Sequence, residues 1–152
     1  MTLQKLSPPE KVIHTQLSMN GSAKFTIDHL GIAVKSIDEA LHFYCDTLGM
    51  TVDHRETVEA ERVHVAMLPA GESRLELLEA TDADSPIAKF GCGLHHIALR
   101  VPDLAAAAAK LTAEGARVLN EPRIGAGGHK YIFVHPRSTG GVLLELIEET
   151  HT

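Results

Sequence analysis

The chain has 152 residues, a hydrophobic fraction of 44% and a net charge of −6, which is typical of one globular domain large enough to bury a core. The acidic charge disfavours nucleic acid and anionic membranes as partners, because both require a basic surface. No apolar run reaches the roughly 18 residues of a membrane-spanning segment. The two cysteines, Cys45 and Cys92, form neither a disulfide framework nor a CxxC metal motif, so we expect reduced thiols and a cytoplasmic protein.

Residues 1–24 differ in pattern from the rest of the chain. They lack the apolar segment of about 7–15 residues that marks a secretory signal. They also contain two clusters of helix- and strand-breaking residues, Pro8-Pro9 and Asn20-Gly21-Ser22. We therefore expect a disordered N-terminal arm over 1–24, followed by one domain over 25–150.

The first predicted elements of this domain are a strand at 27–34 and a helix after it. Ser36, with Glu39 three residues later, forms a capping box at the helix start. Apolar residues then recur at helical spacing: Ile37, Leu41, Tyr44 and Leu48. Three strands are predicted beyond the helix, at 51–58, 62–68 and 73–79.

The same order of elements is predicted a second time. A strand at 94–101 precedes a helix that Asp103 can cap and that carries Leu104, Ala108 and Leu111 at helical spacing. Apolar runs separated by glycine and proline residues then indicate three further strands, at 116–120, 129–135 and 142–148. The chain therefore predicts two βαβββ repeats, at about 26–80 and 93–149.

The two repeats carry the same polar residues at equivalent places. His29 and His96 each occupy the third position of the first strand in their repeat, and Glu76 and Glu145 lie in the two last strands between leucines. The predicted fold is α+β, with the two curved sheets paired into one barrel-like trough and the helices outside. Within the first strand, the alternation of a regular strand predicts that Ile27 and His29 share a face.

Together these four residues predict one metal site. A strand histidine alone is more often a hydrogen-bonded polar residue, and a glutamate between leucines usually faces solvent. Two imidazoles and two carboxylates together suit one divalent cation such as Co²⁺, Zn²⁺, Ni²⁺, Mn²⁺ or Mg²⁺. His95 is an alternative to His96, but superposing the repeats selects His96 and leaves His95 on the other face of its strand.

The chain resembles the vicinal oxygen chelate superfamily, and within it the methylmalonyl-CoA epimerase branch. The resembling segments are IDHLGIAVKSIDEALHFY (27–44), LELLEATDADSPIAKF (75–90), GLHHIALRVPD (93–103) and HPRSTGGVLLELIE (135–148). This resemblance carries the metal-ligand role over to His29, Glu76, His96 and Glu145. It also implies a homodimer, an acyl-CoA substrate, and transfer of the α-proton between the two faces of methylmalonyl-CoA.

Within this resemblance, Glu145 is a candidate base. Counting back from Pro69 makes His64 the candidate for the second base, with Glu76 as the symmetric alternative. Residues 121–140 carry Arg123, Lys130 and Arg137 against one acidic residue, Glu121. These basic residues, Lys130 and Arg137 in particular, are candidates for binding the phosphates of coenzyme A, although an ordinary solvated loop would have the same composition. The alternative functions are a glyoxalase-type lyase with the same metal site and a non-catalytic small-molecule binding protein of the same fold.

Overall fold

A computed structural model describes residues 25–149. Its first repeat consists of β1 (Thr26–Ala33), α1 (Ile37–Leu41) continued by the π-helical turn η1 (His42–Thr47), β2 (His54–Val58), the 3₁₀ turn η2 (Glu59–Glu61), β3 (Val63–Ala70) and β4 (Ser73–Ala80). The short helix α2 (Pro86–Phe90) connects it to the second repeat. The second repeat consists of β5 (Gly93–Val101), α3 (Leu104–Ala113), β6 (Arg123–Ile124), the turn η3 (Ala126–Gly128), β7 (Lys130–Val134), α4 (Pro136–Thr139) and β8 (Leu144–Glu148).

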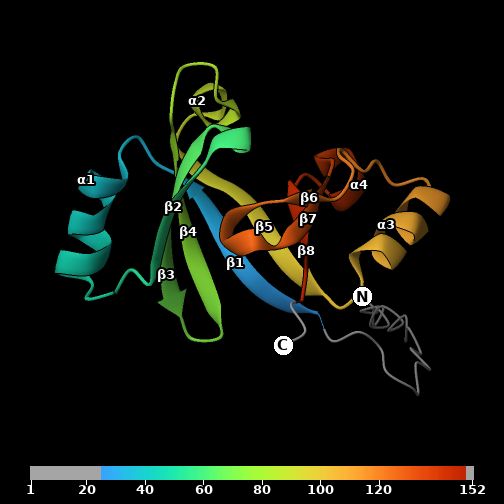
Figure 1. Cartoon of the computed structure of the whole chain (residues 1–152), viewed down its shortest axis with the longest axis horizontal. Helices are drawn as coiled ribbons and strands as arrows, with labels where there is room; N and C mark the ends of the chain where they lie inside the picture. The colour runs from blue at the N-terminus through green and yellow to red at the C-terminus, as the bar shows by residue number, and fades with distance from the viewer. Residues whose placement is uncertain (1–24, 150–152) are drawn as a thin grey trace, which may run out of the picture.

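All eight strands belong to one mixed sheet in the order β2-β3-β4-β1-β5-β8-β7-β6. The two halves are related through the antiparallel pair β1 and β5, and in each half the first strand is parallel to the last strand of its own repeat. Figure 1 shows the helices α1 and α3 at the two ends of the molecule, outside the sheet. The predicted α+β fold of two βαβββ repeats is confirmed.

Both long helices begin where the sequence predicts. The Ser36 side chain accepts a hydrogen bond from the Glu39 backbone, and the Asp103 side chain accepts one from Ala106. Each side chain thereby satisfies one of the backbone N–H groups that the first helical turn leaves free. The caps fix the point at which the chain leaves β1 and β5 and turns to cover the outer face of the sheet.

The structure differs from the predicted elements between residues 116 and 124, and it contains two short helices that were not predicted. Residues 116–120 form no strand, but only one isolated bridge between Val118 and Val134; the partner of β7 is instead the two-residue strand β6. The helices α2 and α4 span only 5 and 4 residues, too few to show a helical period. Their one sequence signal is a capping residue followed by proline, at Ser85-Pro86 and His135-Pro136. The predicted arm at 1–24 lies outside the described residues.

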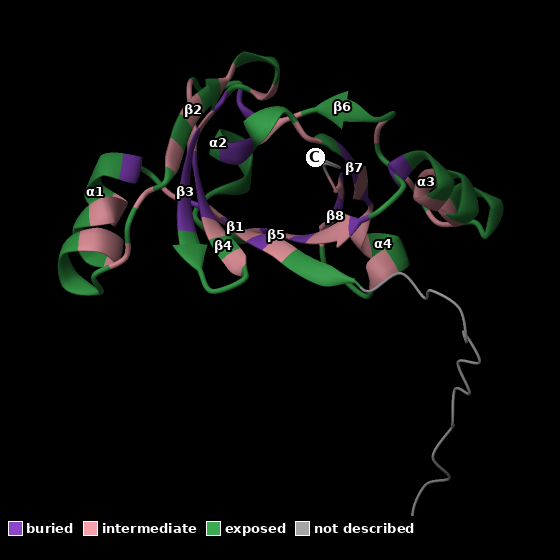
Figure 2. Cartoon of the chain, turned by 60° about the horizontal axis from the view of Figure 1, so that its bottom comes forward, coloured by how far each residue is buried: buried purple, intermediate pink, exposed green. Residues whose placement is uncertain are grey.

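The sheet curls into a ring, and strands such as β3, β4 and β8 carry buried residues on both faces, whereas the edge strands β2 and β6 do not (Figure 2). Outside the ring, Leu68 and Leu77 pack under α1 with Ile37, whereas Ile132 and Leu146 pack under α3. Inside, a third apolar cluster includes Val63, Val65, Met67 and Leu78. The Gly127 N–H donates to Glu56 Oε1 at 2.8 Å, which joins η3 to the edge strand β2 and closes the ring. No helix of residues 25–149 is long and apolar enough to cross a membrane.

Candidate metal centre

Four ionisable side chains meet inside the ring, one from each of the four central strands. His29 lies on β1, Glu76 on β4, His96 on β5 and Glu145 on β8, and their exposed fractions are only 2%, 5%, 4% and 8%. The strand register brings them together: Gly31 pairs with both Glu76 and His96, and in the other half Ala98 pairs with both Glu145 and His29. The two repeats therefore contribute one imidazole and one carboxylate each, at equivalent positions.

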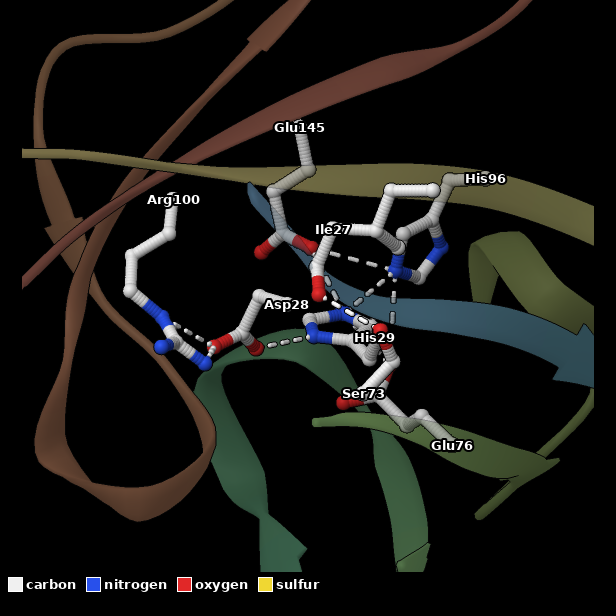
Figure 3. Close-up of polar contacts among 8 residues, drawn as sticks. All are labelled: Ile27, Asp28, His29, Ser73, Glu76, His96, Arg100 and Glu145. Atoms are coloured by element: carbon white, nitrogen blue, oxygen red, sulfur yellow. Dashed lines mark hydrogen bonds and ion pairs between the residues drawn. The ribbon is translucent and has the colours of Figure 1, made fainter. Parts of the chain in front are cut away.

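The reactive atoms of these side chains converge on one point. His29 Nε2 and His96 Nε2 lie 3.0 Å apart, and Glu145 Oε2 lies 2.9 and 3.1 Å from them. Glu76 Oε1 lies 3.6 and 3.4 Å from the same two nitrogens. The two glutamates reach the imidazole pair from different strands on either side of it (Figure 3). The ligand atoms of His29, Glu76 and His96 all lie within 4.8 Å of one another.

Each imidazole is held through its other nitrogen. His29 Nδ1 lies 2.7 Å from Asp28 Oδ2, and Asp28 Oδ1 accepts hydrogen bonds from Arg100 Nε and Nη2 at 3.1 and 2.9 Å. His96 Nδ1 lies 2.8 Å from Nδ1 of His95. A ring that keeps its hydrogen on Nδ1 presents the lone pair of Nε2, and such outer partners are typical of histidines that bind metals. The arrangement leaves both Nε2 atoms directed at the point of convergence.

Two β-bulges produce these outer contacts. In the pairing of β1 with β5, Ile27 lies opposite Leu99 and His29 lies opposite Ala98, so Asp28 is an extra residue on β1. Further along the same pair, His96 and Leu94 lie opposite the consecutive residues Gly31 and Ile32, so His95 is an extra residue on β5. A bulge changes the direction of side chains relative to a regular strand, so both Asp28 and His95 turn to the same side as the histidine that follows. The expectations that Ile27 shares the face of His29 and that His95 points away from the site are therefore wrong: Ile27 is 46% exposed, whereas Asp28 and His95 line the interior.

The electrostatic field at this point favours a cation. Burial lowers the pKa of His29, but the neighbouring carboxylates of Asp28, Glu145 and Glu76 together outweigh this effect and raise it to about 10. Burial also lowers the pKa of His96, but Glu145 and Glu76 together outweigh this effect and raise it to about 9. Burial raises the pKa of Glu145, yet the two imidazoles bring it down to about 2. A negative potential that binds protons this firmly also attracts a metal ion.

The chemistry of the donor set fits a divalent ion. Glu145 Oε2 is buried and lies close to both Nε2 atoms, but it forms no hydrogen bond of acceptable geometry with either. Two nitrogens and a carboxylate oxygen that lie about 3 Å from one another around one point are arranged as ligands of a common ion. Imidazole and carboxylate donors suit borderline divalent metals. The residues present therefore fit a metal ion.

Gly31 makes the close approach of His96 possible. A Cβ added at Gly31 would overlap the imidazole ring of His96, so only glycine allows that ring to lie directly over β1. Its counterpart in the other half is Ala98, which faces His29 and is completely buried. The two halves are thus not identical, and the second histidine lies closer to the opposing strand.

The remaining predicted residues lie elsewhere. His64 is on the outer face of β3, where it contacts Thr57 Oγ1 at 2.8 Å and faces Glu79. The residues of β3 that face the interior are its neighbours Val63, Val65 and Met67. Lys130 and Arg137 are exposed, and neither lines the interior.

The interior is a cavity of about 910 Å³ that extends beyond the metal-binding side chains. Four arginines line it: Arg62, Arg74, Arg100 and Arg123. Arg123 belongs to the basic segment 121–140 that the sequence analysis singled out, whereas Arg62, Arg74 and Arg100 were not predicted as site residues. Glu61 and Tyr131, which line the cavity near η3, were not predicted either. Only the curl of the sheet brings these side chains together.

Comparison with known proteins agrees with this site. Residues 28–133 match the family model described as the Glyoxalase/Bleomycin resistance protein/Dioxygenase superfamily. The uncharacterized protein YqjC of Bacillus subtilis (strain 168) is 45% identical over 127 residues, which cover 80% of this chain and 91% of YqjC. The ethylmalonyl-CoA/methylmalonyl-CoA epimerase of Cereibacter sphaeroides is 37% identical over 127 residues, with 79% and 95% covered.

A solved structure agrees as well. Streptomyces coelicolor methylmalonyl-CoA epimerase (Q60A), in complex with 2-nitronate-propionyl-CoA, superposes with a TM-score of 0.78 at 41% identity, covering 82% of this chain and 97% of that one. The buried histidines and Glu76, which could hold a metal ion, lie within the matched residues. The chain belongs to the glyoxalase/bleomycin resistance protein/dioxygenase superfamily.

Proposed function

We propose that the chain is a methylmalonyl-CoA epimerase that works with one divalent metal ion. The observation that carries this proposal is the buried set of two imidazoles and two carboxylates inside a cavity large enough for an acyl group. Relatives named as epimerases of this substrate, matching about 80% of the chain, support the choice of substrate. The ligands of the ion would be His29, Glu76, His96 and Glu145.

The chemistry of the substrate suits the cavity. Methylmalonyl-CoA offers a thioester carbonyl and a carboxylate on either side of the carbon that is inverted, and a divalent ion supplies Lewis-acid stabilisation of the negative charge that develops on oxygen. Arg62, Arg74 and Arg123 line the cavity and give it positive charge for the phosphates of coenzyme A. In this proposal they replace Lys130 and Arg137, whose side chains do not line it.

Glu145 is the proposed base for one face of the substrate. The two imidazoles lower the pKa of its carboxyl group against the effect of burial, and a carboxyl group that binds a metal ion is ionised. It lies nearer to both Nε2 atoms than Glu76 does. A positioned acid–base group typically contributes about 10²–10⁴-fold to the rate.

The test is proton exchange at the α-carbon. Each stereoisomer of methylmalonyl-CoA is incubated in deuterated water with the protein as purified, after chelation, and after reloading with Co²⁺, Zn²⁺ or Mn²⁺, and deuterium incorporation and inversion are followed. The proposal expects both to depend on metal. Metal-dependent turnover of a hemithioacetal without exchange in methylmalonyl-CoA would instead indicate a glyoxalase-type lyase, and a protein that binds no metal would indicate a non-catalytic binding protein.

A further inference from the structure

A second carboxyl group enters the cavity from the turn between β2 and β3. Glu61 is the last residue of η2, and the next residue, Arg62, has φ 55° and ψ 45°. Among residues 25–149 Arg62 is the one residue other than glycine with a positive φ. This left-handed conformation is unfavourable for a residue other than glycine. It lets the chain turn at Arg62, so that Glu61 lines the cavity and β3 begins at Val63.

The second repeat provides a fitted site for this carboxyl group. The carboxyl group of Glu61 and the ring of Tyr131 on β7 both lie beside Gly125, and Tyr131 is only 4% exposed. Gly125 leaves the room for both: a Cβ at this position would lie 2.9 Å from Tyr131 Cε1 and 3.3 Å from Glu61 Oε1. The Glu61–Tyr131 pair therefore connects the two halves across the cavity, near its closure between η3 and β2.

The surroundings of Glu61 favour its acid form. Burial raises the pKa of its carboxyl group, although the nearby Tyr131 hydroxyl lowers it. A carboxyl group with these neighbours can hold a proton and release it.

Asp28, Asp84 and Glu148 also line the cavity, and each has a partner that is charged or belongs to a helix start. Asp28 is bound to His29 and Arg100, and Asp84 faces Arg62 at 3.7 Å. Glu148 accepts a hydrogen bond from the first backbone N–H of α3. Glu61, by contrast, has an uncharged partner that leaves its carboxyl group able to exchange a proton.

We infer that Glu61 is the second acid–base residue of the reaction, acting on the face of the substrate opposite Glu145, with Tyr131 as its positioning residue. The inference rests on the proposed function, because inversion needs one group to remove a proton and another to return one on the opposite face. Glu145 and Glu61 reach the same cavity from different halves of the ring, as such a pair requires. In this inference Glu61, and not His64, is the second base, because His64 lies on the outer face of β3 and does not line the cavity.

The proton balance is simple. In one direction the Glu145 carboxylate takes the α-proton, and the electron pair of the broken C–H bond moves into the thioester carbonyl. The Glu61 carboxylic acid then gives its proton to the opposite face, and the returning electron pair forms the new C–H bond. Exchange with solvent restores the starting protonation, and the other stereoisomer uses the two residues in reverse.

The test is Glu61→Gln, assayed with both stereoisomers of methylmalonyl-CoA in deuterated water. We expect inversion to fall by about 100-fold or more, while one stereoisomer still exchanges its α-proton with retention through Glu145. Metal content and melting temperature should stay close to wild type. Glu61→Asp should restore part of the inversion, and Tyr131→Phe should slow exchange in the same stereoisomer that Glu61→Gln affects.

Glu59→Gln is the matched control, because Glu59 lies on the same turn and is exposed; it should invert the substrate as fast as wild type. Inversion by Glu61→Gln within a few-fold of wild type would overturn the role of Glu61 and leave the proposed function intact. If Glu61→Gln slowed α-proton exchange equally in both stereoisomers, and in proportion to its loss of metal, the role of Glu61 would also be overturned. A metal-loaded wild-type protein that exchanges neither stereoisomer would instead remove the proposed function, and this inference with it.

Discussion

Glu145 has two proposed roles, as metal ligand and as base, and a single substitution separates them. Glu145→Gln keeps an oxygen that can bind the ion but removes the group that accepts a proton. We expect a moderate loss of metal affinity and a fall in turnover of about 100-fold or more, measured by metal titration and by inversion of methylmalonyl-CoA. A fall in turnover no larger than the fall in metal occupancy would show that Glu145 is only a ligand.

Asp28 holds His29 in position, and its own charge is fixed by its partners. Although burial raises the pKa of Asp28, its hydrogen bonds with His29 and Arg100 lower it to about 2, so the carboxylate is ionised when it orients the imidazole. Asp28→Asn keeps the shape but removes the charge, and removal of such an outer partner typically costs about 10–100-fold in metal affinity. The measurement is competitive metal titration, with Asp46→Asn on the exposed face of η1 as the control. Unchanged affinity in Asp28→Asn would mean that the bulge positions His29 without help from this carboxylate.

At the level of the strands, the approach of β1 to β5 depends on Gly31. Gly31→Ala should push the His96 ring away from the point of convergence, because the new Cβ would occupy the same space. We expect loss of metal binding and a decrease in stability of about 1–3 kcal/mol from overpacking, measured by metal content and denaturant unfolding. The counterpart Ala98→Gly removes a methyl group without a clash and should retain metal. Metal binding by Gly31→Ala at the wild-type level would refute the steric argument.

The βαβββ plan of the two repeats and the equivalent positions of the two histidines and two glutamates could be predicted from the sequence, because the repeats supply the same signal twice. The directions in which other side chains point could not be predicted from the sequence. On β3 both faces are apolar and buried, with Val63, Val65 and Met67 inside and Ala66 and Leu68 outside, so no polarity pattern shows which face His64 shares.

The bulges limited the prediction in a second way. An extra residue in one strand becomes visible only when the pairing with the other strand is known, and for that reason the roles of Asp28 and His95 did not follow from alternation. The pairing of Glu61 with Tyr131 depends on the closure of the ring, which joins residues 70 positions apart. Such contacts carry no local sequence signal.

At the scale of the whole molecule, the proposed ion connects the two repeats. His29 and Glu76 belong to the first and His96 and Glu145 to the second, while separate apolar clusters under α1 and α3 stabilise each half. The fold should therefore persist without metal but be less stable.

A ligand that binds only the folded state stabilises it by about 2.7 kcal/mol at a hundredfold excess over its dissociation constant. For a domain of this size, that corresponds to a melting temperature higher by about 5–10 °C. We expect chelation to lower the melting temperature of the wild-type protein by this amount and reloading with Co²⁺ or Zn²⁺ to restore it, followed by calorimetry. His96→Ala is the control: lacking one imidazole of the set, it should melt at the same temperature with and without metal. A wild-type protein whose melting temperature does not respond to metal would contradict a site shared between the two repeats, whatever its activity.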